Sequence, residues 1–157
     1  MKIMELIGSP YKYFQAGKTE KAWKWAFQTG SGVLYTVVVE MNKPWLAEIG
    51  FSAKAPGAGK FTTAATGTGD AFKVMNTIRA IVQDFIKLYI NQFGKPPRII
   101  SFSGATDEPT RLKLYDKLAA KPKDWLPDNK WNYKLHRTAE KDGYKVYVLV
   151  RTDLLDQ

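Results

Sequence analysis

The sequence has no cysteine and only one histidine, His136, among its 157 residues. Without cysteine the chain has no disulfide framework, no thiolate zinc site and no cysteine nucleophile. A single histidine leaves no set of imidazole ligands, so we expect no metal site. No apolar run approaches the roughly 18 residues of a membrane-spanning helix, and the first residues lack the layout of a secretory signal. We therefore expect a soluble, cytoplasmic protein that does not bind membranes.

Acidic residues are also scarce relative to basic ones. The chain has 24 Lys plus Arg against 15 Asp plus Glu, which gives a net charge of +9. The excess is +4 over residues 1–60, +2 over 61–107 and +3 over 108–157, so no basic arm carries it. A dispersed excess is typical of a solvated surface, and it also suits anionic partners such as nucleic acid or coenzyme A. The length predicts one domain over 1–157, with its core at about 20–151.

The first third of the chain has the period-two pattern of half-buried strands. Aromatic residues alternate along 23–27, a Gly-rich turn follows at 29–32, and a β-branched run covers 33–41. Alternation returns over 45–51. These segments predict three consecutive antiparallel strands.

Beyond residue 70 the apolar period changes to that of a helix. Residues 70–93 predict one long amphipathic helix, which Gly94 and two following prolines end. A strand over 98–103, a second helix beginning near Asp107 and a hairpin over 131–151 follow. We expect an α+β fold with a single mixed, mostly antiparallel sheet and two main helices. The strand–helix–strand step requires one parallel pair within that sheet.

A glycine-rich segment at the start of the long helix is a candidate ligand site. Its residues are Thr66, Gly67, Thr68, Gly69, Asp70 and Ala71. Glycines let backbone N–H groups approach a ligand, and a helix start offers unpaired donors that suit a pyrophosphate. The Asp70 carboxylate can satisfy the same donors, so an ordinary capped helix is the other interpretation.

The order of elements and two short motifs resemble the GNAT superfamily of acyl-CoA N-acyltransferases. In that family a Gln/Arg-x-x-Gly-x-Gly/Ala turn holds the coenzyme A pyrophosphate, and Gly67 and Gly69 match its glycines, with Ala64 at the leading position. A tyrosine on a later helix of the family often protonates the departing thiolate. Tyr115, in Leu-Tyr-Asp-Lys, is similar to it, although the usual Gly-Phe after the motif is absent. The chain is also similar to small phage-encoded proteins of this fold.

Two functions follow from the resemblance, and whether the chain is an enzyme stays open at this point. The first is a non-enzymatic phage-type protein that needs no cofactor. It would bind a host protein, a virion protein or nucleic acid through its basic surface, in the host cytoplasm or the virion. The alternative is an acetyl-CoA-dependent N-acetyltransferase with Tyr115 as general acid. Glu40 and Glu48 could then deprotonate an amine through water. Because the motifs are incomplete, the sequence favours the first.

Several residues also have simpler interpretations. Tyr115 lies on the apolar stripe of its predicted helix, which is typical of a packing tyrosine. Trp23 and Trp25 occupy the inward phase of a strand and suit a core. If their face is open, they would stack single-stranded bases beside Lys21 and Lys24.

Overall fold

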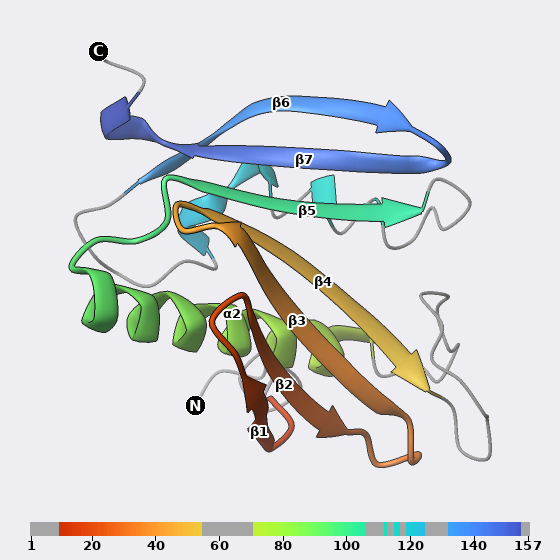
Figure 1. The fold of residues 1–157 in the computed structure, drawn as a ribbon. Helices are drawn as coiled ribbons and strands as arrows, with labels where there is room; N and C mark the ends of the chain where they lie inside the picture. Colours follow the sequence, from red (N-terminus) through yellow and green to blue (C-terminus); the bar gives the residue numbers. More distant parts are fainter. Residues whose placement is uncertain are drawn as a thin grey trace.

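The protein is built on one sheet of seven strands, in the order β1-β2-β3-β4-β5-β7-β6 (Figure 1). The computed structural model describes residues 10–54, 71–105, 112, 115–116, 119–124 and 132–154. The strands are β1 (Tyr13–Lys18), β2 (Ala22–Gln28), β3 (Leu34–Lys43), β4 (Leu46–Lys54), β5 (Ile99–Ala105), β6 (Tyr133–Lys141) and β7 (Tyr144–Arg151). The helical elements with described bounds are α2 (Ala71–Phe93), η1 (Pro122–Asp124) and η2 (Thr152–Leu154).

The sheet is mixed and mostly antiparallel, as the sequence predicts. Only β4 and β5 pair in parallel, with Leu46 opposite Ile99 and Ile49 opposite Phe102. Their connection contains α2, so the predicted parallel strand–helix–strand step is confirmed. On its other side β5 pairs antiparallel with β7.

The helix content differs from the expectation of two main helices. The described ranges contain one main helix, α2, and the segment expected to form the second lies largely outside them. The residues of that segment with described helical conformation are Leu112, Tyr115, Asp116, Ala119 and Ala120. The prediction is therefore confirmed for one helix, and the fold is α+β with α2 as its main helix.

One face of the sheet is buried against α2 through large aromatic residues. Trp23 and Trp25 of β2 are 2% and 3% exposed, and their rings lie 5.3 and 6.2 Å from that of Phe85 in α2. This confirms the core interpretation of both tryptophans. Because the rings are buried, Trp23 and Trp25 do not offer the open face that base stacking beside Lys21 and Lys24 would require.

Strand β1 is an element that the sequence pattern does not reveal. It pairs antiparallel with β2 at the edge of the sheet, and most of its residues are exposed. The Tyr13 hydroxyl donates a hydrogen bond to the Asp84 carboxylate of α2, which ties this edge to the helix. Burial, followed by the hydrogen bond to Asp84, raises the pKa of Tyr13 to about 12.

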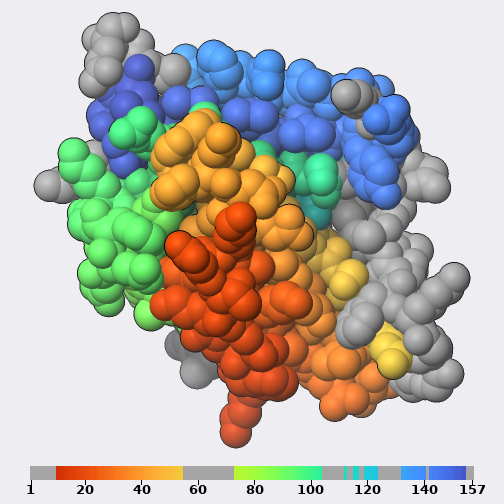
Figure 2. Space-filling view, viewed as in Figure 1, coloured from red at the N-terminus to blue at the C-terminus, as the bar shows by residue number. Residues whose placement is uncertain are grey.

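The opposite face of the sheet carries more polar side chains. Lys24 and Glu40 are exposed, and Glu48 and Ser101 are half-buried. Figure 2 shows the strands themselves forming the front of the molecule, with α2 emerging at one side. Among the described residues, no helix packs on this face.

Two glycine turns end elements where the sequence predicts. Gly94 has φ of 84°, and its N–H bonds to the Ile90 carbonyl at 2.7 Å, closing α2. Asp142 and Gly143 both have positive φ, 54° and 82°, which suits the tight turn between β6 and β7.

In the part of the chain that the structure describes, no helix has the length and hydropathy of a membrane span.

Candidate functional site

The two parallel strands separate beyond their last paired residues, and we call this point the fork. The pairing of β4 with β5 ends at Ile49 and Phe102, although β4 continues to Lys54 and β5 to Ala105. Figure 1 shows the two strands diverging toward their carboxyl ends. Each keeps its outer neighbour, since β3 pairs with β4 as far as Lys54 and β7 pairs with β5 as far as Ala105. Beyond Ile49 and Phe102, the residues of β4 and β5 therefore do not pair with each other.

The helix side of the fork contains a small apolar cavity of about 30 Å³. It is lined by Ile49, Phe51, Met75, Ile78, Arg79, Val82, Phe102 and Tyr115. This volume is about the room of one water molecule. Apart from the exposed Arg79 and the hydroxyl of Tyr115, the lining side chains are apolar, which favours an uncharged ligand segment.

Tyr115, the candidate general acid, lies in the floor of this fork. It is 4% exposed, and its ring centroid is 6.0 Å from that of Phe51 and 5.0 Å from that of Phe102. Those two side chains come from the diverging strands, one from each. The expected packing role is therefore confirmed, and the same packing places the tyrosine at the point where the strands part.

Tyr147 of β7 holds the chain segment that carries Tyr115. Its hydroxyl donates to the Asp116 carboxylate at 2.5 Å and is 3.2 Å from the Leu112 carbonyl oxygen, while the Lys145 ammonium lies 3.3 Å from the same carboxylate. The Tyr147 hydrogen bond, followed by Lys145, lowers the pKa of Asp116. Burial and the bond to Asp116 raise the pKa of Tyr147, so both hydrogen-bonding partners keep their roles at neutral pH.

Glu48 and Glu40 lie on the other face of the sheet. They are paired directly across β3 and β4, and Glu48 is also aligned with Ser101 of β5. Glu48 precedes Ile49, the last residue of β4 that pairs with β5, so it lies at the level of the fork. Because neighbouring residues of a strand face opposite ways, the carboxylate and Tyr115 approach the fork from opposite faces.

Of the glycine-rich segment predicted as a ligand site, the structure describes one residue. Ala71 is the first residue of α2, whereas Thr66, Gly67, Thr68, Gly69 and Asp70 lie outside the described residues. The pyrophosphate interpretation of this segment stays a prediction. His136 is exposed on β6. Within the described ranges, no three His, Cys, Asp or Glu side chains gather as a metal site would require.

Sequence reasoning missed the residues that shape the fork. Phe51, Phe102 and Met75 read as ordinary core positions, and only the register of β4 and β5 brings them together. For Tyr147 the sequence does hold a signal, because a tyrosine on the buried phase of a strand needs a partner for its hydroxyl. Which partner it finds depends on the tertiary fold.

Comparison with solved structures gives a distant likeness. No protein-family model and no curated protein matches the chain. The crystal structure of the N-acetyltransferase PseH from Campylobacter jejuni is similar, at 13% identity and a TM-score of 0.43, over 84% of this chain and 70% of that one. The function proposed below rests on the fork and not on this likeness.

The order of elements behind the GNAT resemblance is present in the structure. Antiparallel strands lead to α2, then to the parallel return strand β5, and then to the β6–β7 hairpin. This order, and the parallel pairing of β4 with β5, agree with what the resemblance implies. A phage origin stays a prediction.

Proposed function

We propose that the protein is an acyl-CoA-dependent N-acetyltransferase whose reaction takes place at the fork between β4 and β5. One observation carries the proposal: Tyr115, singled out by its motif, packs against both side chains that flank the fork, Phe51 and Phe102. This favours the enzyme over the non-enzymatic, cofactor-free protein that the incomplete motifs suggest.

The fork has the chemistry that an acyl-pantetheine arm requires. Such an arm is narrow, mostly apolar and interrupted by amides, and the fork combines an apolar floor with strand edges that do not pair with each other. Edge backbone groups can bind amides as a further strand would. When bound, acetyl-CoA would supply a thioester carbonyl activated toward amines.

The protein's own residues would then move two protons. On the sheet face opposite α2, the Glu48 carboxylate accepts a proton from the attacking amine through water, with Glu40 beside it. On the helix face, the Tyr115 hydroxyl donates a proton to the departing sulfur. The C–S bond breaks as the C–N bond forms, and the proton lost by the nitrogen balances the one gained by the thiol.

The test is acetyl transfer to a panel of small amines, followed by release of free thiol. Because the chain has no cysteine, a thiol reagent reports only coenzyme A. A positioned general acid contributes on the order of 10²–10⁴ in rate, so Tyr115→Phe should lower kcat at least about 100-fold while the affinity for acetyl-CoA changes little.

A matched control is Tyr133→Phe, which removes another buried tyrosine hydroxyl, bonded to the Pro97 carbonyl and away from the fork. Its kcat should stay within about threefold of wild type, once thermal melts show that both variants are folded. Equal losses in the two variants, or no thiol release with any amine, would count against the proposal.

A further inference from the structure

Two hollows lie side by side at the far end of α2 from the fork. The larger, of about 590 Å³, lies between the β1–β2 turn, the β3–β4 turn and the last turn of the helix. The smaller, of about 270 Å³, is bounded by the start of β4, the segment after α2 and the end of β7. Pro44 and Phe93 line both hollows, so they form one continuous surface around the Phe93 ring.

Positive charge dominates this surface. The cations that line the two hollows are Lys18, Lys21, Lys95, Arg98 and Arg151. Among the described lining residues Glu20 is the one acid, and the Arg151 guanidinium donates to the Asp153 carboxylate at 2.7 Å. Five cations less two acids leave an excess of three. Such an excess at one place suits a polyanion.

Exposed aromatic rings lie among these cations. Phe93 is 49% exposed and Trp45 is 38% exposed, and both line the smaller hollow. Phe93 also packs on Tyr89, with ring centroids 4.5 Å apart. Large exposed rings beside cations are what stacked bases and their phosphates require.

Hydrogen bonds fix the backbone that presents these rings. The Tyr89 hydroxyl donates to the Pro44 carbonyl, which joins α2 to the β3–β4 turn. The buried Arg151 guanidinium donates to the Pro96 carbonyl at 2.7 Å, which joins β7 to the segment after the helix. The surface is therefore preorganised, which lowers the entropic cost of binding.

A helix C-terminus attracts cations by itself, and this explains part of the charge. Lys18 lies 3.4 Å from the Gln92 side chain in the last turn of α2, and Lys95 follows the helix directly. The helix end does not account for Lys21 or Arg98, nor for two exposed rings.

We propose that this surface binds single-stranded nucleic acid. We call it the Phe93 surface and define it by Lys18, Lys21, Trp45, Phe93, Lys95 and Arg98. Bases stack on Phe93 and Trp45, and the four cations contact the phosphates. An acidic protein would use the same cations, but it would have no need for the exposed rings.

The Phe93 surface is separate from the fork and independent of the proposed acyl transfer. Met75 of the fork and Phe93 are 18 residues apart on α2, about 27 Å along the helix axis. Nucleic acid and acetyl-CoA should therefore bind at the same time, and a failure of one proposal leaves the other standing.

The experiment measures fluorescence anisotropy of a labelled oligo-dT of about 16 nucleotides, within the range that single-strand binders cover. If the four cations each neutralise a phosphate, the slope of log affinity against log salt is about −2.8, a loss of about 50-fold between about 50 and 200 mM salt. Phe93→Ala should weaken binding at least about fivefold, the lower limit for one stacked base. Lys21→Glu should make the slope of log affinity against log salt less negative.

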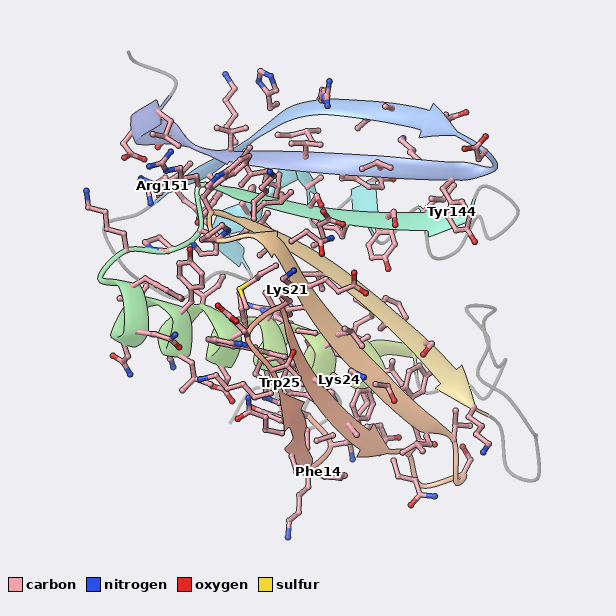
Figure 3. All side chains as sticks on the ribbon, viewed as in Figure 1. Phe14, Lys21, Lys24, Trp25, Tyr144 and Arg151 are labelled. Carbon is pink, nitrogen blue, oxygen red and sulfur yellow. The ribbon has the colours of Figure 1, made fainter. Side chains whose placement is uncertain are left out.

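Matched controls come from the other end of β1, where Figure 3 places Phe14 away from Lys21. Phe14→Ala removes a ring that is 61% exposed, and Lys12→Glu reverses an exposed lysine. Both should bind within about twofold of wild type. Affinity that does not change with salt, or equal losses of affinity in the controls, would overturn the proposal. So would polyglutamate that binds as tightly as oligo-dT and whose affinity Phe93→Ala does not change.

Discussion

Replacing Tyr147 by phenylalanine removes one hydroxyl group and leaves the buried ring in place. The hydroxyl bonds to the Asp116 carboxylate at 2.5 Å, and the Leu112 carbonyl oxygen is 3.2 Å away. A hydrogen bond to a charged group contributes about 1.5–3 kcal/mol to stability. Because the Asp116 side chain is 53% exposed, water replaces part of the lost bond. We therefore expect the free energy of unfolding to fall by about 1–1.5 kcal/mol.

The loss should also depend on pH. The Tyr147 hydrogen bond is the largest cause that lowers the pKa of Asp116 below its ordinary value of 3.8. A carboxyl whose pKa is depressed by folding adds stability above its unfolded pKa, and this stability disappears as the pH falls through the folded value. In Tyr147→Phe the pKa of Asp116 returns toward 3.8. The difference between wild type and variant should therefore be full at neutral pH and shrink below about pH 4.

Urea unfolding at several pH values measures this difference directly. In a thermal melt at neutral pH the melting temperature should fall by about 2–6 °C, since 1 kcal/mol corresponds to about 2–4 °C in a chain of this size. Tyr144→Phe is the control, because it removes the hydroxyl of a tyrosine that is 47% exposed, at the first residue of the same strand (Figure 3). A pH-independent difference, or an equal loss in the control, would refute the role of the Tyr147–Asp116 bond.

Two further changes test the fold. Phe85→Ala leaves a cavity beside Trp23 and should lower the free energy of unfolding by about 3–5 kcal/mol. Leu88→Ala, at a 39% exposed position of the same helix, should lower it by well under half as much. Chemical denaturation of the two variants measures this difference. Gly94→Ala places a side chain at φ 84° and should cost about 1 kcal/mol, and a change below about 0.3 kcal/mol would contradict the strained helix end.

The sequence could predict those parts of the fold that one-sided burial imposes. Trp23, Trp25 and Phe27 alternate because one face of β2 packs on α2. The parallel β4–β5 pair followed from a helix between two strands. Strand β1 escaped prediction because an exposed edge strand has no burial alternation; its exposed pattern even includes Phe14.

The candidate sites were less predictable, because they depend on contacts between distant segments. The motif around Tyr115 could be found in the sequence, but its neighbours Phe51 and Phe102 meet it only through the register of two strands. The Phe93 surface joins three segments that are widely spaced along the chain. A segment-by-segment count of charge could not reveal it.

Calorimetric titration with acetyl-CoA tests the central claim, that the fork between β4 and β5 holds an acyl-CoA. Wild type should bind with a saturable heat below millimolar concentration. Met75→Trp fills the fork from α2 and should abolish that heat, whereas Leu88→Trp, at an exposed position further along the helix, should preserve it. No binding by folded wild type at millimolar acetyl-CoA, or unchanged binding by folded Met75→Trp, would contradict the claim.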